Sequence, residues 1–388
     1  MKLSHSQFAP FRALIVGGGV AALEAALALR ELAGERVAVT VLAPEPEFVD
    51  RAMRVREPFA YAAAHHYPLD EIAHDLGAEL IADAFAWLDA PARQVHTENG
   101  RTLEYDALLL AMGARPRAAF AHGVTIDDRI LDEQLHGLVC DVEGGYVGSI
   151  AFVAPPAPSW PLPIYELALM TADRAYDMWS GVAITVVTPE DAPLAAFGRA
   201  ASDAVTRLLE DRGITVIPSA QAGVPANGRV AIEPGRRVLP VDRVVALPRL
   251  YGPSTPGVPR KGAGGFIPID AHCRVRRLQD VFAAGDATDF PIKHGAVAAQ
   301  QANAAAEAIA ALAGAPITPR PFDPELRALL LGGDQPLYLS ARVVGGRGSR
   351  CQISERPLWS PPSKIAARYL APYLASRDRA VDRTPALT

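Results

Sequence analysis

The chain has 388 residues, of which half are hydrophobic and 21% are charged, and its formal net charge is −5. This composition excludes a disordered chain, leaves room for two or three domains and, without a long basic run, disfavours a nucleic-acid partner. Three distant cysteines, Cys140, Cys273 and Cys351, exclude a disulfide framework and give no metal site. Because there is no signal peptide and no long apolar run, we expect a cytoplasmic protein without a transmembrane segment; peripheral membrane contact stays open.

The first informative stretch covers residues 12–42 and is typical of a strand, a glycine turn, a helix and a second strand. The turn has the GxGxxA pattern and opens a helix that we expect at about 20–33. Its first glycine permits the tight turn, its second lets a pyrophosphate approach the backbone, and the helix N-terminus attracts the anion. We therefore predict a dinucleotide site formed by Gly17, Gly19, Val20, Ala21 and Ala22.

The adenosine end of this site lacks its usual acidic residue. The position at the end of the second strand is Ala43, so either Glu45 or Glu47 reaches back to the ribose or the backbone alone holds it. Arg51 follows, and it either pairs with a phosphate or faces water.

An antiparallel ribbon and a buried strand come next. Alternating residues from about 79 turn at Asn99-Gly100, which is a strong hairpin signal, and we place Phe85 of this stretch at the cofactor. The apolar run 105–112 predicts a strand covered on both faces, and at Ala111-Met112-Gly113 small residues let the backbone approach a ligand. Arg115-Pro116 then gives an extended exit toward the next domain.

A second α/β unit repeats this architecture without its glycine turn. We expect strands at 148–153, 182–187, 214–218, 230–232 and 238–247, with helices at 164–180 and 198–212. A proline-rich segment, 154–163, stands where the phosphate turn would be; prolines lack N–H donors, and Trp160 is bulky. NAD(P)H binding in the usual manner is therefore doubtful.

A third motif follows at 281–296. A strand ends at Gly285-Asp286, and Lys293-His294 precede a helix that we expect from Gly295-Ala296 to residue 312. Asp286 either accepts a bond from a ribityl hydroxyl or orients a phosphate, whereas alone it would be a turn acid. The helix N-terminus suits the negative charge of a reduced flavin ring.

The C-terminal region predicts a hairpin and a helix. The hairpin combines an alternating run at 337–343, a Gly345-Gly346 turn and residues 351–353, and we expect the helix at 364–374 with a frayed chain beyond Arg377. Its aromatic and basic residues favour an interface or a core-capping helix over a membrane anchor.

The GxGxxA turn, the end of the strand before Gly113 and the Gly285-Asp286 segment, in this order, resemble the pyridine nucleotide-disulfide oxidoreductase superfamily over residues 12–312. The resemblance implies an α/β fold with two Rossmann-like domains and an extended FAD. The FAD domain would comprise 1–116 and 251–317, the second domain 117–250 would be inserted, and 318–388 would form a small C-terminal region.

Within that superfamily, Pro155-Pro156, Trp160-Pro161 and Tyr165-Glu166 are similar to the sulfide:quinone oxidoreductase and flavocytochrome c sulfide dehydrogenase branch. Trp160 occupies the position of that branch's redox cysteine, and no cysteine pair replaces it. Sulfide oxidation is therefore not implied.

The resemblance implies an FAD-dependent oxidoreductase that moves electrons between a small organic or sulfur-containing substrate and a quinone or similar acceptor. Four residues are catalytic candidates. Trp160 stacks on the flavin or is a packed core indole, and Lys293 stabilises the reduced flavin or is a surface lysine. His294 moves a proton near neutral pH or caps a helix, and Tyr165 caps its helix or faces the substrate. The alternatives are an NAD(P)H-dependent flavin reductase with unconventional nicotinamide binding and a degenerate FAD-binding partner protein; a homodimer stays open.

Overall fold

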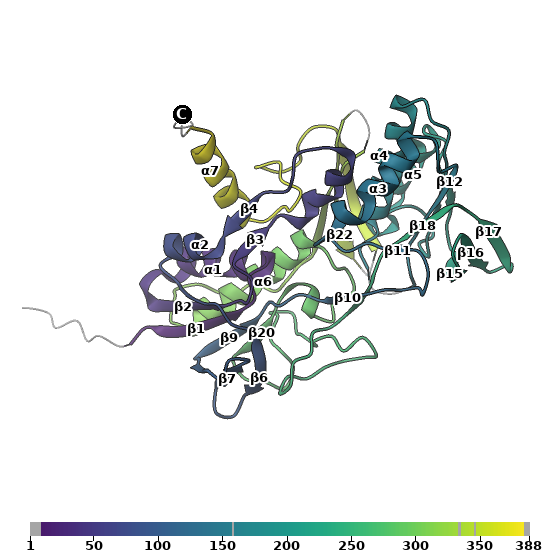
Figure 1. The fold of residues 1–388 in the computed structure, drawn as a ribbon. Coiled ribbons are helices and arrows are strands. Elements are labelled where there is room, and N and C mark those ends of the chain that lie inside the picture. The colour runs from purple at the N-terminus through teal and green to yellow at the C-terminus, as the bar shows by residue number, and fades with distance from the viewer. Residues whose placement is uncertain (1–8, 157–158, 333–334, 345–346, 384–388) are drawn as a thin grey trace, which may run out of the picture.

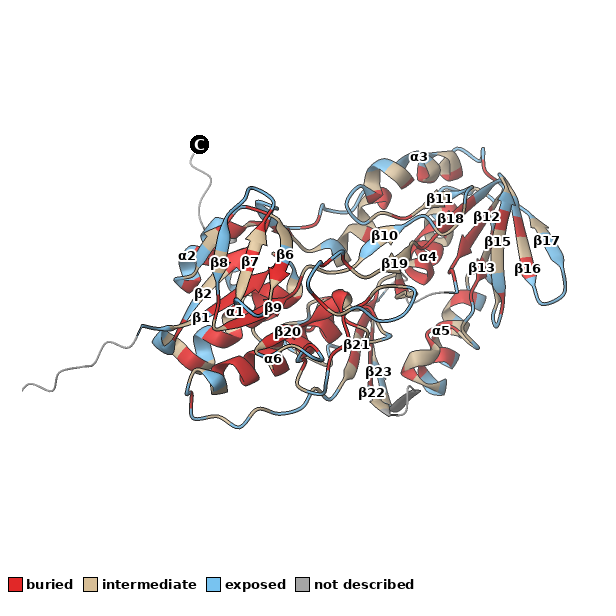
Figure 2. Cartoon of the chain, turned by 90° about the horizontal axis from the view of Figure 1, so that it is seen from below, coloured by how far each residue is buried: buried red, intermediate tan, exposed pale blue. Residues whose placement is uncertain are grey.

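The computed structural model describes residues 9–156, 159–332, 335–344 and 347–383, which form two α/β units side by side (Figure 1). The buried residues gather on the strands of both sheets and on the helix faces against them (Figure 2). The predicted fold class, with a discontinuous first domain and an inserted second one, is confirmed.

The first unit is built on a parallel sheet in the order β20-β9-β1-β2-β5. Segments far apart in sequence meet here, because β20 pairs with β9 across the whole inserted unit. The alanine-rich helices α1 and α6 pack closely against each other beside this sheet, since their small side chains allow a near approach. The elements are β1 (Phe11–Val16), α1 (Val20–Ala33), η1 (Gly34–Arg36), β2 (Val37–Leu42), α2 (Leu69–Leu76), β5 (Glu79–Ile81), β9 (Ala107–Leu110), β20 (Val281–Ala283), η4 (Gly285–Ala287) and α6 (Gly295–Leu312).

Small antiparallel sheets decorate the first unit. The predicted Asn99-Gly100 turn joins two strands of one of them, and Gly100 has a positive φ of 81°. The elements are β3 (Glu47–Val49), η2 (Arg51–Phe59), β4 (His66–Pro68), β6 (Phe85–Asp89), β7 (Gln94–Thr97) and β8 (Thr102–Glu104).

The second unit has its own parallel sheet, in the order β11-β18-β12-β13-β14. The strand expected at 238–247 is two strands, broken where the Asp242 carboxylate accepts bonds from the N–H groups of Gly148 and Ser149, both at 2.9 Å. Helix α3 was not expected, although its buried Leu131, Leu135 and Val139 have helical spacing. The elements are β11 (Val124–Thr125), α3 (Leu131–Glu143), β12 (Ser149–Val153), α4 (Leu162–Asp177), β13 (Ala183–Val187), η3 (Ala195–Phe197), α5 (Arg199–Glu210), β14 (Thr215–Ile217), β15 (Gln221–Ala226), β16 (Arg229–Glu233), β17 (Arg237–Pro240) and β18 (Arg243–Ala246).

Two crossing strands connect the units. β10 (Arg115–Arg117) leaves the first unit and β19 (Arg249–Tyr251) returns to it, and they pair antiparallel. We call this pair the interdomain ribbon.

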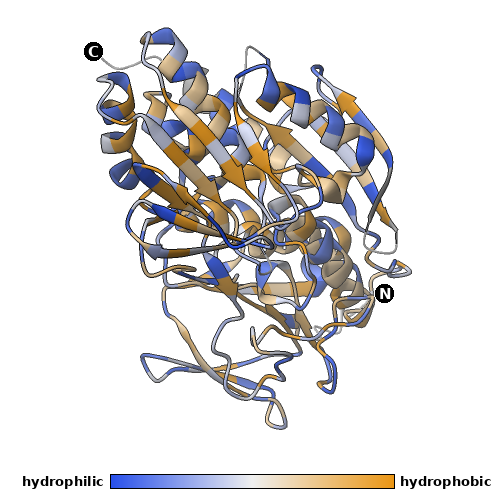
Figure 3. Ribbon diagram, turned by 90° about the vertical axis from the view of Figure 1, so that its right-hand side faces the viewer, coloured by the Kyte–Doolittle hydropathy of each residue, from blue (hydrophilic) through white to orange (hydrophobic). Residues whose placement is uncertain are grey.

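The C-terminal region packs on both units. β21 (Glu325–Leu330), β22 (Leu337–Val344) and β23 (Arg347–Ser354) form an antiparallel sheet whose buried side chains, such as Leu326 and Leu339, join the core of the second unit. The predicted turn at 345–346 lies outside the described residues. Hydrophobic residues follow the strands of the sheets in Figure 3, whereas hydrophilic ones dominate the outer helix faces.

The last helix begins later than the sequence suggested. Instead of 364–374, α7 spans Leu370–Arg383, so the described residues beyond Arg377, 378–383, are helical and not frayed. Pro372 explains the shift, because a proline fits the first turn of a helix but would break the interior of one that began at 364.

Candidate cofactor and active site

Three glycine turns meet at one edge of the first sheet. The strands β20, β9 and β1 are neighbours, so their carboxyl ends bring Gly285, Gly113 and Gly17 to the same edge. Backbone bonds tie the strand ends together: Ala111 N–H donates to Val16 O at 2.8 Å, and Ala284 N–H donates to Leu110 O at 3.1 Å. The carboxyl edge of a parallel sheet is where such folds bind nucleotides.

The first turn has the shape that a bound phosphate requires. Gly17 has φ +125°, and a Cβ there would lie 2.4 Å from Ala111 O, so only glycine fits. At Gly19, by contrast, a Cβ would meet no atom within 4 Å, which leaves open space in front of α1. The backbone can therefore be approached at this second glycine.

Two helix N-termini without side-chain caps flank the edge. Within the described part of the chain, no side chain caps α1 or α6, and neither helix has an acidic residue in its first turn. Gly285, with φ +78°, lies between them: a Cβ there would be 3.4 Å from the side chains of both Ala21 and Ala298. Free N–H groups and two positive dipole ends fit an anionic dinucleotide, so the residues present fit the cofactor that the sequence predicts.

Asp286 and Lys293 form the charged part of the site. Burial raises the pKa of Asp286 to about 6, against the opposing effect of Lys293. Burial also lowers the pKa of Lys293 to about 8, while Asp286 acts in the other direction. The ammonium of Lys293 donates to Thr288 O and lies 3.9 Å from the centroid of the Phe266 ring. Lys293 is therefore a buried cation, not a surface lysine.

His294 and Trp160 form an aromatic pair at the start of α6. Their ring centroids lie 4.4 Å apart at 36°, and Trp160 also contacts Phe197 edge-on at 5.8 Å. Burial lowers the pKa of His294 to about 3, with Lys364 adding to the effect. His294 is thus neutral at pH 7, contrary to the expectation that it titrates near neutrality. Its Nδ1 is buried and has no hydrogen-bond partner among the described residues.

Tyr165 and Glu166 do not cap their helix. The buried Tyr165 hydroxyl donates to Glu190 Oε2 at 2.7 Å, beyond the end of β13. The Glu166 carboxylate pairs with Lys364 at 2.8 Å and accepts a bond from Leu331 N–H, also at 2.8 Å. The Tyr165 hydroxyl is therefore bound to Glu190 inside the second unit, and this contact gives no support to the expectation that Tyr165 faces the substrate.

The other predicted cofactor residues are spread along the first unit. Ala43 is buried at the end of β2, whereas Glu45 and Arg51 are exposed. The charge of Arg51 acts on Asp128 of the second unit, and Phe85 is half-buried in β6 opposite Thr97. The remaining ones line the three turns and the starts of α1 and α6: Val20, Ala21, Ala22, Ala111, Met112, Gly113, Gly295 and Ala296.

The C-terminal segment contributes contacts that sequence reasoning missed. Lys364 is buried next to Glu166, and Ile365 covers the start of α6 so closely that a Cβ at Gly295 would lie 3.2 Å from it. The carboxylate of Glu24 in α1 accepts backbone bonds from residues 368–370, the N-terminus of α7. The only sequence signal was a lysine and an isoleucine within the aromatic stretch around Trp359.

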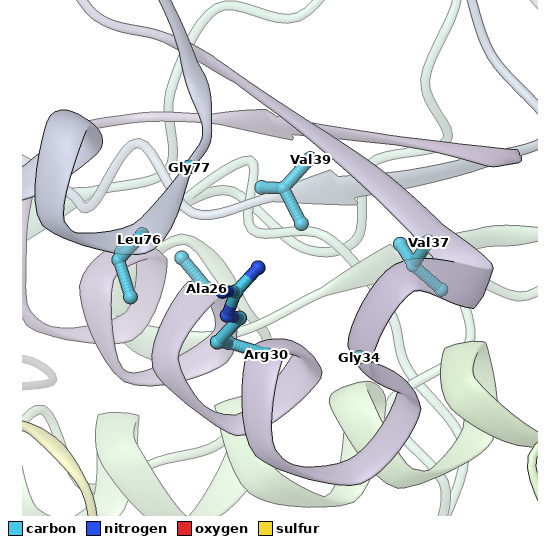
Figure 4. A pocket seen from close by; sticks show the side chains of 7 residues that line it. All are labelled: Ala26, Arg30, Gly34, Val37, Val39, Leu76 and Gly77. Atoms are coloured by element: carbon cyan, nitrogen blue, oxygen red, sulfur yellow. The ribbon is translucent and has the colours of Figure 1, made fainter.

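A small hollow beside α1 is not part of this site. It is lined by residues of α1, β2 and the end of α2, and its volume of about 20 Å³ suffices for one water molecule (Figure 4). Among the described residues, no three His, Cys, Asp or Glu side chains could hold a metal ion. In the same part of the chain, every helix is too short or too polar to cross a bilayer.

Comparison with known proteins places the chain in a family. Residues 11–144 and 166–306 match the pyridine nucleotide-disulphide oxidoreductase family. Two NADH dehydrogenase-like proteins of Mycobacterium tuberculosis, from strains CDC 1551 / Oshkosh and ATCC 25618 / H37Rv, are each 28% identical over 71% of this chain and 72% of theirs.

Solved structures show the same fold at low sequence identity. The sulfide:quinone oxidoreductase of Aquifex aeolicus has a TM-score of 0.78 at 19% identity and covers 96% of this chain and 90% of its own. An NAD-dependent persulfide reductase of A. fulgidus has a TM-score of 0.60 at 18% identity, covering 86% of this chain and 64% of its own. A ferredoxin reductase of Rhodopseudomonas palustris has a TM-score of 0.64 at 18% identity, covering 86% of this chain and 83% of its own. With its three glycine turns on one sheet edge, the chain belongs to the pyridine nucleotide-disulphide oxidoreductase family and is an oxidoreductase.

Proposed function

We propose that this oxidoreductase binds FAD in an extended form and moves electrons between a small organic or sulfur-containing substrate and a quinone or similar acceptor. The observation that carries the proposal is the convergence of three glycine turns and two uncapped helix N-termini on one sheet edge, next to a buried lysine.

The side chains of this edge have separate tasks. Gly17 and Gly19 admit the pyrophosphate to the start of α1, and Asp286 holds a ribityl hydroxyl. FAD, when bound, supplies the two-electron chemistry. Lys293 provides a positive charge near neutral pH, and the N-terminus of α6 adds a positive dipole end, so both favour a negative charge that develops beside them.

Trp160 distinguishes this site from one that works with a thiol pair. The indole lies against His294, the residue just before α6, where it would keep water from that side of the site. No described cysteine lies there: Cys140 is exposed on α3, Cys273 is buried in the first unit, and Cys351 is in β23. The protein would therefore transfer electrons without a covalent sulfur intermediate. The structural similarity to a sulfide:quinone oxidoreductase supports a quinone as acceptor.

A second candidate donor is NAD(P)H. It is favoured by the two relatives named NADH dehydrogenase-like, and it is opposed by the proline-rich segment 154–163 in place of a glycine turn.

A pair of glycine substitutions tests flavin binding. Gly19→Val places its side chain in open space, so the variant should fold like the parent and lose FAD in a fluorescence titration. Gly137→Val, at an equally open position on the surface of α3, is the matched control and should retain FAD. Equal flavin affinity of Gly19→Val and the parent would refute the assigned pyrophosphate site.

Anaerobic stopped-flow reduction then separates the donors. Bleaching of the flavin by a thiol or sulfide compound, followed by reoxidation with a quinone, supports the first proposal. Bleaching by NADH or NADPH alone supports the second candidate. A flavin that none of these donors reduces would contradict both.

A further inference from the structure

The interdomain ribbon carries an unusual set of charges. Its register places Arg117 directly opposite Arg249 and Arg115 opposite Tyr251. Since side chains two residues apart on a strand share a face, all four project from the same face of the ribbon, with Pro116 and Leu250 on the other. The Arg117 guanidinium carbon lies 5.1 Å from the centroid of the Tyr251 ring. We call these four residues the ribbon arginine cluster.

No acid neutralises the ribbon arginine cluster within the described residues. None of its three arginines forms an ion pair or donates a side-chain hydrogen bond there, and Arg249 Nε is buried without a partner. Other arginines of the first unit are paired, as Arg12 is with Asp106 and Arg93 is with Asp280. Like charges directly opposite each other on two strands destabilise them, and a buried donor without an acceptor is costly. Arg115 and Arg117 are exposed to water, so within the cluster it is the buried Nε of Arg249 that lacks an acceptor.

The position of the cluster is one where nucleotides bind. β19 begins three residues after β18 ends, at the carboxyl edge of the second sheet, and β10 begins just after Gly113 at the carboxyl edge of the first. In the sequence, prolines follow β12 at the edge of the second sheet, where a glycine-rich phosphate turn would stand.

We propose that the ribbon arginine cluster binds a phosphate group with two or more negative charges. Guanidinium groups bind phosphate oxygens through paired N–H donors, and the arginines on one strand stand about 7 Å apart, a reach that suits a phosphate or pyrophosphate. The phosphate belongs either to a nicotinamide dinucleotide or to a free phosphate compound. In the first case the proposal deepens the second candidate function, with the ribbon replacing the missing glycine turn.

Titration calorimetry on the full chain tests this site, with inorganic phosphate, pyrophosphate, NADH and NADPH as separate ligands. Arg117→Gln and Arg249→Gln should each weaken binding about tenfold, and the double variant about a hundredfold, since each removes charge-assisted hydrogen bonds. Arg207→Gln removes an exposed arginine of α5 that has no ion pair among the described residues, and it should leave the affinity unchanged.

The outcomes are distinct from those of the flavin tests. If NADH or NADPH binds more tightly than pyrophosphate, and the double variant loses this binding, the ligand is a dinucleotide. If the dinucleotides and pyrophosphate bind with similar affinities, the ligand is a free phosphate compound. Absence of binding to the parent, binding unaffected by the double variant, or an equal loss in Arg207→Gln would each overturn the proposal. Protein that stays colourless with excess FAD, and whose pyrophosphate binding is lost in the double variant, would refute flavin binding and leave this site intact. The double variant should unfold no more easily than the parent, because it removes two like charges that face each other across the ribbon.

Discussion

The buried ion pair between Lys364 and Glu166 yields a sharp stability prediction. Their side chains are 6% and 0% exposed, and both Glu166 oxygens lie 2.8 Å from the Lys364 ammonium. Lys364→Met leaves the carboxylate buried with, among the described residues, only the bond from Leu331 N–H. Breaking a buried pair on one side costs about 3–5 kcal/mol, so the free energy of unfolding should fall by that amount. Urea denaturation followed by circular dichroism measures the loss.

Two further variants separate lost charge pairing from lost packing. Adding Glu166→Gln to Lys364→Met removes the unpaired charge and keeps an acceptor for Leu331, so the double variant should regain most of the lost stability. Lys261→Met is the control, because Lys261 pairs with Asp289 at 3.0 Å but is 69% exposed, and it should cost less than about 1 kcal/mol. If Lys364→Met costs no more than Lys261→Met, or if the double variant is no more stable than the single one, the reasoning fails.

Three other predictions concern single groups. Glu24→Ala removes the acceptor of three backbone N–H groups at the start of α7, and it should lower the free energy of unfolding by about 1–3 kcal/mol in urea. Burial lowers the pKa of Lys293 to about 8. Between about pH 8 and 10.5, Lys293 therefore binds more protons in the unfolded chain than in the folded one, so its contribution to the free energy of unfolding rises with pH. Measured without added cofactor, Lys293→Met should be more stable than the parent, and this difference should shrink across that pH window. A difference that is independent of pH would contradict the assigned pKa. In native protein a thiol reagent should modify exposed Cys140 quickly and buried Cys273 only after unfolding, and mass spectrometry of the labelled peptides checks the order.

The three turns and the family resemblance that they carry were sufficient to predict the two Rossmann-like domains, because each turn directly follows a buried strand. Strand–turn–helix signals are local, and neighbouring strands of a parallel sheet share their carboxyl edge. The residues around Gly17 and Gly285 could therefore be assigned to one site without coordinates.

The contacts of the C-terminal segment could not be predicted in this way. Glu24 and Leu370 are 346 residues apart, and Glu166 and Lys364 are 198 apart. No local pattern marks a carboxylate that will meet a partner so distant in sequence. The neutrality of His294 has the same origin, since its low pKa depends on burial and on the distant Lys364. Helix α3 is a different case, because its apolar spacing is a local pattern that the sequence itself contains.

The double attachment of residues 364–370, to Glu166 on one lobe and to Glu24 on the other, bears on how the protein matures. A ribosome releases this stretch only after both lobes have been made, and lobes emerging early can fold while translation continues. The orientation of the two lobes would then be fixed last, when residues 364–370 contact Glu166 and Glu24. A released chain that lacks residues 364–383 should therefore carry two folded lobes whose mutual orientation is not fixed.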